Sequence, residues 1–228
     1  MNQGRSPFPA LPNLSDAERV ARSRAAFERL KSRHSCRAFA ATPVPRAVIE
    51  NAIRAAGTAP SGANHQPWHF AAIESSQKKR AIREAAEAEE RRFYGEDDET
   101  PKAGKEWLGA LAPIGTDAAK PFLENAPWLI VCFAQRTGGI AEDGETQNYY
   151  VNESVGIACG MLIATLHEAG LATLTHTPSP MGFLRDLCGR PANEKPLMIV
   201  VVGHPADEAT VPDHALRKKP LEQISTWL

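Results

Sequence analysis

Runs of apolar residues predict four strands. Residues 128–134 and 197–202 are continuous apolar runs with β-branched members, a pattern typical of strands covered on both faces. Residues 68–73 and 171–175 are shorter, mostly apolar stretches that also favour strands. Because segments of helical pattern separate these runs, the chain is predicted to have an α+β fold with helices around one sheet.

The N-terminal part predicts a flexible arm followed by a helix. Residues 1–13 are rich in proline, which favours an irregular arm before a single domain over residues 14–228. Ser15 and Glu18 have the spacing of a capping box, which opens a helix running to about Ser32.

A second helix is predicted over residues 46–56. Pro45 suits its first turn, Ile49 and Ile53 lie on its inner face, and Gly57 is able to close it in the left-handed conformation.

Three later segments also have helical pattern. Residues 77–94 consist of good helix formers whose charges lie on most faces, so this helix is expected to be weakly held. Residues 152–169 are apolar enough to be buried on several sides and stop at Gly170, and residues 183–187 favour a short helix.

Two segments lack a clear pattern. Residues 95–116 mix acidic residues, proline and glycine around an isolated Trp107–Leu108 pair, which predicts a long mobile segment and hence a lid at about residues 88–120. Residues 210–228 have too little apolar periodicity to stand alone and are expected to wrap a neighbouring subunit or their own domain. Together with the apolar helix at 152–169, these features predict a homodimer.

Composition excludes several classes of function. A chain of 228 residues suits one domain, and its net charge of −1 leaves no basic surplus for nucleic acid. Four widely spaced cysteines and the lack of a secretory pattern at the N-terminus suggest free thiols in a cytoplasmic protein. The longest apolar stretch, residues 155–166, is too short and too interrupted to span a membrane, so a small-molecule ligand is expected.

A basic cluster follows the first helix. Arg33, His34, Ser35 and Arg37 place two guanidinium groups and a hydroxyl within five residues, which suits the phosphate of a cofactor. The spacing alone favours a solvated helix end over a phosphate site.

A loop of small side chains follows the second predicted helix, and it would let backbone N–H groups approach a flat ligand. Its residues are Pro60, Ser61, Gly62, Ala63 and Asn64. The composition alone favours an ordinary turn over a ligand site, and the occurrence of this loop together with the basic cluster is what suggests a ligand.

No metal site is expected. His65 and His69 are four residues apart, but Pro67 between them prevents a shared helical face. The chain also lacks a GxGxxG or Walker motif for a separate nucleotide-binding fold.

Three motifs carry a resemblance to a known family. They are RxSxRxF at residues 33–39, PSxxNxQPW at 60–68 and a basic stretch ending in proline at 217–220. With these motifs the chain resembles the nitroreductase superfamily. The segments AGTAPSGA, SVGIACG, GRPANEKPLM and EATVPD are similar to its iodotyrosine deiodinase branch.

The resemblance implies an FMN-binding α+β fold with a central, mostly antiparallel sheet and an intertwined homodimer whose active sites lie at the subunit interface. The residues that it assigns to FMN are Arg33, His34, Ser35, Arg37, Pro60, Ser61, Gly62, Ala63, Asn64, Thr175, His176, Thr177, Arg217 and Lys218. The family's late Arg-Lys-Pro appears here as Lys218-Lys219-Pro220, with Arg217 one place earlier, so the phosphate contact is open between Arg217 and Lys218.

Glu90, Tyr94 and Lys120 match the deiodinase residues that hold an amino-acid zwitterion. The resemblance implies that Glu90 pairs with the ammonium group, while Lys120, at the start of the next helix, and Tyr94 meet the carboxylate. Without the family, Glu90 is one acid among several on a helix and Lys120 is a surface charge.

Two further residues are assigned to the flavin ring and to the phenol ring of the substrate. The resemblance implies that the Thr177 hydroxyl, in preference to that of Thr175, bonds to flavin N5, and that the Ala63 N–H faces the phenolate oxygen of the substrate.

The implied activity is FMN-dependent reductive dehalogenation of 3-iodo-, bromo- or chlorotyrosine to tyrosine and halide. An NAD(P)H-dependent nitroreductase or quinone reductase is the main alternative, and a flavin-binding module without turnover is another. The electron donor is open between a separate NAD(P)H-dependent reductase and a ferredoxin, and the preferred halogen and biological role are also open.

Overall fold

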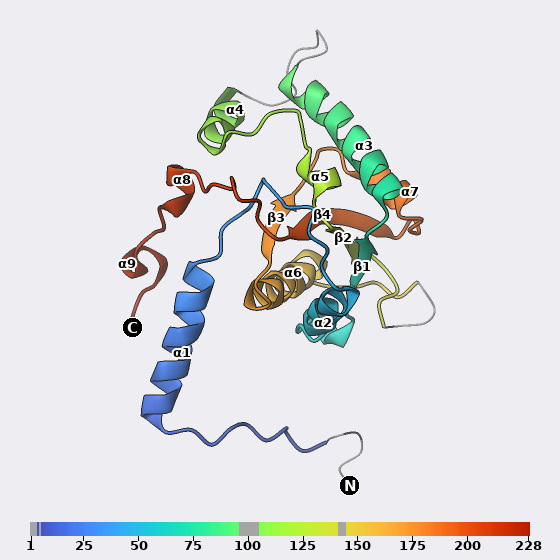
Figure 1. The fold of residues 1–228 in the computed structure, drawn as a ribbon. Coiled ribbons are helices and arrows are strands. Elements are labelled where there is room, and N and C mark those ends of the chain that lie inside the picture. Colours follow the sequence, from blue (N-terminus) through green and yellow to red (C-terminus); the bar gives the residue numbers. More distant parts are fainter. Residues whose placement is uncertain (1–3, 5, 96–104, 141–144) are drawn as a thin grey trace. The chain divides into compact units, whose positions relative to one another are not determined.

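The structure is a computed structural model, shown in Figure 1, which describes residues 4, 6–95, 105–140 and 145–228. The chain divides into two compact units, Met1–Arg33 and His34–Leu228. Part of the predicted lid, residues 96–104, lies outside the described residues.

The first unit contains helix α1 (Asp16–Lys31), and the predicted capping box is confirmed. The Glu18 N–H donates to Ser15 Oγ over 3.3 Å, and the Ser15 N–H donates to Glu18 Oε2 over 2.8 Å. No residue of α1 is buried.

The second unit is built on a four-stranded antiparallel sheet with the order β1-β2-β4-β3. The strands are β1 (Trp68–Ile73), β2 (Trp128–Gln135), β3 (Ala172–His176) and β4 (Glu194–Gly203). The predicted strands and the mostly antiparallel sheet are therefore confirmed. Strand β4 begins three residues earlier than its apolar run because Lys195 and Glu194 still pair with Ala134 and Gln135 of β2, beyond a register shift at Pro196.

Helices cover both faces of this sheet (Figure 1). One face packs against α2 (Arg46–Ala56) and α6 (Val151–Glu168), and the other against α3 (Ser76–Tyr94), α5 (Phe122–Asn125) and α7 (Gly182–Leu187). Alternate residues of β2 contribute to the two cores, with Ile130 on one side and Val131 on the other. This two-sided burial explains why β2 and β4 are continuous apolar runs.

The remaining elements are short. They are η1 (Gly62–Asn64), α4 (Lys105–Leu111), η2 (Ala112–Ile114), α8 (Asp213–Leu216) and α9 (Leu221–Ile224). No helix in the described ranges is long and apolar enough to cross a membrane.

Two predictions about helix ends are wrong. Gly57 is right-handed, with φ −65°, because its N–H donates to the Ile53 carbonyl and the helical turn continues past it. Lys120 does not begin a helix: it precedes Pro121, the N-cap of α5.

The predicted lack of regular structure at residues 105–114 and the predicted burial of α6 also need correction. Residues 105–114 form α4 and η2. Trp107 and Leu108 are not an isolated apolar pair, because Leu111 lies one helical turn after Trp107 on the same face of α4. Helix α6 buries one side against the sheet, but Gly156, Ile157 and Gly160 are exposed in the single chain.

Candidate active site

A cavity of about 220 Å³ lies at the end of β3, between this strand, α3, α5 and the α4–η2 segment. It brings together seven of the predicted site residues: Arg37, Glu90, Tyr94, Lys120, Thr175, His176 and Thr177. These positions are up to 140 residues apart in the sequence, so folding and not a local motif brings them together into a candidate site.

The ammonium group of Lys120 is at the centre of the charged side of the cavity. Its Nζ lies 3.4 Å from Glu90 Oε2 and 5.6 Å from the centre of the Tyr94 ring. It also donates to Thr116 Oγ1 over 3.2 Å and to the Asp117 carbonyl. Lys120 is thus a buried cation whose charge is satisfied by an acid and two neutral oxygens.

Glu90 and Tyr94 reach Lys120 from the same face of α3, as their i,i+4 spacing requires. The Tyr94 hydroxyl lies 3.4 Å from the Thr116 carbonyl, to which it donates. Gly95 ends the helix immediately afterwards in the left-handed conformation, with φ 75°, so the chain turns away beyond Tyr94.

Burial perturbs the acid of this group. It raises the pKa of the Glu90 carboxyl, and the nearby Lys120 ammonium opposes that rise with a smaller effect. The Lys120 ammonium group therefore favours the ionised form of a carboxyl group that burial makes harder to ionise.

His176 supplies an imidazole on the other side of the cavity. Its ring meets Phe122 edge to face at 5.5 Å, and among the described residues its buried Nε2 has no hydrogen-bond partner. Burial, with smaller contributions from Lys120 and Arg37, lowers the pKa of His176 to about 3, so the imidazole is neutral near pH 7. Burial also lowers the pKa of the Arg37 guanidinium.

The segment before Arg37 runs beside β3. Ser35 forms a parallel bridge with Thr173, and the Cys36 N–H donates to the Thr173 carbonyl over 3.0 Å. His34, Ser35 and Arg37 belong to the second unit, while Arg33 ends the first.

The Pro60–Asn64 loop is not part of this cavity. It precedes β1, whereas the cavity lies at β3, and β1 and β3 are the opposite edges of the sheet. Neighbouring strands are about 4.8 Å apart, so the two edges are separated by roughly 14 Å. The structure therefore places the Pro60–Asn64 loop at the opposite sheet edge from the seven predicted residues of the cavity.

The shape of this loop is unusual. Ala63 and Asn64 have positive φ values of 49° and 58°, which non-glycine residues rarely adopt. A Cβ on Gly62 would stand 2.9 Å from the Tyr149 carbonyl, so only glycine fits there. The Ser61 Oγ accepts a hydrogen bond from the Gln66 N–H over 2.9 Å and helps to fix the turn.

Arg217 and Lys218 follow α8 and are both exposed. Arg217 Nη2 lies 3.2 Å from His214 Nδ1, and Lys218 Nζ donates to the Ala215 carbonyl over 2.9 Å. Neither side chain lines the cavity, and the geometry does not favour one over the other as a phosphate ligand.

Sequence reasoning missed the apolar wall of the cavity. Trp107 and Leu111 contribute to it from α4, and Phe122 contributes from α5. The i,i+4 spacing of Trp107 and Leu111 was the available signal, but the surrounding Gly and Pro obscured it.

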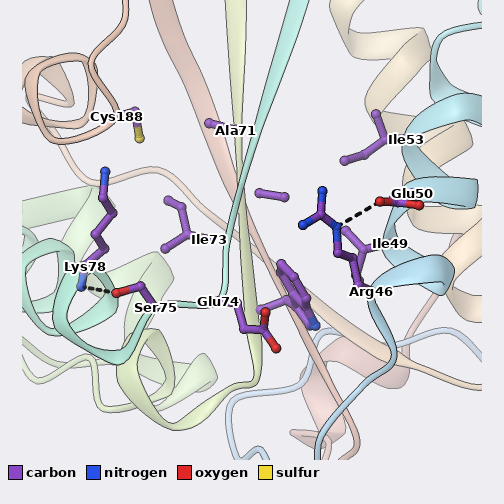
Figure 2. Close-up of a pocket in the computed structure, with 12 residues that line it drawn as sticks. Arg46, Ile49, Glu50, Ile53, Ala71, Ile73, Glu74, Ser75, Lys78 and Cys188 are labelled. Atoms are coloured by element: carbon purple, nitrogen blue, oxygen red, sulfur yellow. Dashed lines mark hydrogen bonds and ion pairs between the residues drawn. The ribbon is translucent and has the colours of Figure 1, made fainter.

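A larger hollow of about 500 Å³ lies beside β1 (Figure 2). Arg46 of α2 and Glu50 form an ion pair of 2.8 Å on one side of it, and Lys78 of α3 lies on the other. None of the predicted site residues lines this hollow, so its size alone does not make it a candidate active site.

The architecture and the charged cavity at the sheet edge define a class of protein. The model of the Nitroreductase family matches residues 30–204, and the chain belongs to the nitroreductase family. Its relatives include the iodotyrosine deiodinase of Haliscomenobacter hydrossis, which is 47% identical over 196 residues covering 86% of each chain. Iodotyrosine deiodinase 1 of Homo sapiens is 45% identical over 211 residues, 92% of this chain and 70% of the human one.

Solved structures agree with this assignment. Oxidized iodotyrosine deiodinase bound to FMN and 3-iodo-L-tyrosine is similar with a TM-score of 0.71 and 28% identity, over 89% of this chain and 100% of that one. A nitroreductase of Bacteroides fragilis with bound FMN has a TM-score of 0.64 at 18% identity, over 89% of this chain and 98% of that one, and shares the fold.

Proposed function

We propose that this protein is an FMN-dependent reductase that removes the halogen from halogenated L-tyrosines such as 3-iodo-L-tyrosine, giving tyrosine and halide. The observation that carries the proposal is the buried Lys120–Glu90 pair, 3.4 Å apart with Tyr94 beside it, in the cavity that Thr175, His176 and Thr177 line. The identity to iodotyrosine deiodinases supports the same substrate class.

The residues at the β3 edge fit FMN. Thr175 and Thr177 are exposed hydroxyls at the rim, His176 has a buried nitrogen without a partner among the described residues, and Arg37 is a partly desolvated cation. This donor set suits the polar edge of a flavin, and Ser35 beside β3 suits its anionic tail. We assign the phosphate to Ser35 with either Arg217 or Lys218. FMN, when bound, supplies the electrons of the reaction.

Glu90, Tyr94 and Lys120 hold the amino-acid part of the substrate. Glu90 accepts hydrogen bonds from the ammonium group, and Lys120 and the Tyr94 hydroxyl donate to the carboxylate. A zwitterion therefore replaces the Lys120–Glu90 pair with two new pairs and leaves neither buried charge alone. A hydrogen bond to a charged group contributes about 1.5–3 kcal/mol, so the clamp contributes strongly to affinity.

The α4–η2 segment and the end of α3 form the lid. Trp107 is 57% exposed in the free protein although it lines the cavity, so it has apolar surface that a bound ring covers. Closure of the lid on the zwitterion excludes water from the cavity and strengthens every charge interaction within it.

Ala63 and Thr177 act on the aromatic end of the substrate and on the flavin. The Ala63 N–H donates to the phenolate oxygen and holds it ionised, while the Thr177 hydroxyl, rather than that of Thr175, donates to flavin N5. The left-handed backbone at Ala63 fixes the direction of its N–H.

Because the Pro60–Asn64 loop and the cavity lie at opposite sheet edges, a second copy of the chain supplies the loop in an intertwined homodimer. Helix α6 provides a suitable contact face. Ile157 on it is 47% exposed, and a Cβ on Gly156 or Gly160 would meet nothing within 4 Å in this chain, so another helix can approach closely. The C-terminal segment after α8, whose Leu221 and Trp227 are exposed, wraps the partner.

The test is an anaerobic incubation of the FMN-loaded protein with dithionite and 3-iodo-L-tyrosine, with tyrosine quantified by chromatography against a sample without protein. Dithionite replaces the physiological donor, which we expect to be a separate NAD(P)H-dependent reductase or a ferredoxin. Release of tyrosine that depends on the protein supports the proposal. No tyrosine from an FMN-loaded sample, together with NADPH-dependent reduction of a nitroarene or quinone, overturns it.

A further inference from the structure

Glu87, one turn before Glu90 on α3, links this helix to the backbone of Lys120. Its Oε1 accepts a hydrogen bond from the Lys120 N–H over 2.8 Å, and its Oε2 accepts one from Arg83 Nη1 over 2.6 Å. The side chain is 15% exposed, so water competes little for either bond. One carboxylate therefore connects α3 with the residue that bears the cavity's ammonium group.

Arg83 extends this link to α5. Its Nε donates to Glu124 Oε2 over 2.7 Å, and Arg80 Nε donates to Glu124 Oε1 over 3.0 Å. The stretch from Lys120 to Glu124 is thus tied to α3 at both ends, by a backbone N–H at one end and a carboxylate at the other. The next residue, Pro121, has no N–H and cannot make this bond, so the bond at the first end is made by Lys120.

The position of Lys120 relative to α3 matters because the other two residues of the clamp are on that helix. Glu90 and Tyr94 follow Glu87 on α3, and Lys120 Nζ stands 3.4 Å from Glu90 Oε2. A small slide of the chain at Lys120 would move its ammonium group away from both partners. Displacements of about 1 Å are enough to weaken a preorganised site strongly.

We propose that Glu87 is a positioning residue, whose carboxylate fixes the Lys120 backbone against α3 so that Lys120, Glu90 and Tyr94 face one zwitterion. This inference rests on the proposed function. Glu87 does not contact the substrate in this role. Its effect depends on the reach of its side chain to the Lys120 N–H and not on its charge.

Two substitutions separate reach from charge. Glu87→Gln keeps the length and an oxygen for the Lys120 N–H but loses the charge that pairs with Arg83. Glu87→Asp keeps the charge but is one methylene shorter, so it no longer spans from α3 to the Lys120 backbone. Glu84→Ala is the matched control, because Glu84 also meets Arg83, at 3.4 Å, but is 61% exposed and has no bond to Lys120.

The experiment measures the Kd of 3-iodo-L-tyrosine by titration of flavin fluorescence, and kcat/KM for 3-iodo-L-tyrosine and for 2-iodophenol, which lacks the zwitterion. We expect Glu87→Asp to raise the Kd about tenfold and to change kcat/KM for 2-iodophenol less than about twofold. Glu87→Gln and Glu84→Ala are expected to stay within about twofold of wild type for both ligands.

Three results overturn the inference. In the first, Glu87→Gln weakens 3-iodo-L-tyrosine as much as Glu87→Asp. In the second, Glu87→Asp reduces kcat/KM for both substrates in parallel. The third needs no variant: hydrogen exchange of the FMN-loaded wild type that finds the Lys120 amide unprotected. A wild type that neither binds nor dehalogenates 3-iodo-L-tyrosine overturns the proposed function itself, whereas an active wild type with any of the three results overturns only the role of Glu87.

Discussion

Lys120 Nζ lies 3.4 Å from Glu90 Oε2, and only 2% of the Lys120 side chain and 12% of the Glu90 side chain are exposed. The desolvation of two buried charges offsets much of their attraction, so such a pair adds little net stability by itself. Removing one partner, however, leaves the other charge buried and unpaired. A ligand that displaces this pair must therefore bring both an ammonium group and a carboxylate, as a free amino acid does.

Glu90→Gln is expected to weaken the binding of 3-iodo-L-tyrosine by on the order of 30- to 100-fold, or about 2–3 kcal/mol, because the ligand ammonium loses its charged partner. Titration of flavin fluorescence measures the effect. Glu89→Gln is the control, since Glu89 pairs with Arg92 at 2.9 Å and does not line the cavity. Equal affinities of the Glu90→Gln protein and wild type would contradict this assignment.

The affinity for 3-iodo-L-tyrosine should also decrease as the pH is lowered. Burial raises the pKa of Glu90 above the ordinary 4.5, so in the free protein the carboxyl takes up its proton at a higher pH than a solvated glutamate. The ligand ammonium needs the ionised form, and the Kd therefore rises as the pH falls toward 4.5. Titrations at several pH values test this, and the Glu90→Gln protein should lack this pH dependence.

His176 should make the protein sensitive to acid. Its pKa of about 3 lies below the ordinary 6.5, so its contribution to stability is present above pH 6.5 and is lost as the pH falls toward 3. Between pH 7 and pH 5, the free energy of unfolding should fall by about 1–2 kcal/mol less in His176→Phe than in wild type. Urea unfolding at both pH values provides the measurement, and His214→Phe, at an exposed position, is the control. If the free energy of unfolding falls by the same amount in His176→Phe as in wild type between pH 7 and pH 5, His176 does not have this role.

Ile157→Arg on α6 should separate the proposed dimer, because it puts an unpaired charge on the contact face. Size-exclusion chromatography with light scattering should then find a monomer that also retains less FMN, since the Pro60–Asn64 loop of the second copy is lost. Ile140→Arg, at another exposed position outside α6, should leave both properties unchanged. A dimeric, FMN-loaded Ile157→Arg protein would contradict the proposed interface.

The strands were predictable because burial of a sheet on both faces leaves little choice of residue. The runs at 128–134 and 197–202 correspond to β2 and β4, and the capping box at Ser15 gave the start of α1. Short helices were less predictable, as α4 illustrates. It has only seven residues and contains Gly109, so local preference is weak and tertiary contacts decide its conformation.

The sequence by itself determined the α+β class, the four strands and the pairing of Glu90 with Tyr94 on one helical face, because these depend on local periodicity. Only the tertiary structure decided that Lys120 meets that face, that Glu87 holds its backbone there, and that the Pro60–Asn64 loop lies at the opposite sheet edge from Thr177. Contacts between distant segments follow from how helices and strands pack together, and neither residue spacing nor residue type encodes that packing locally.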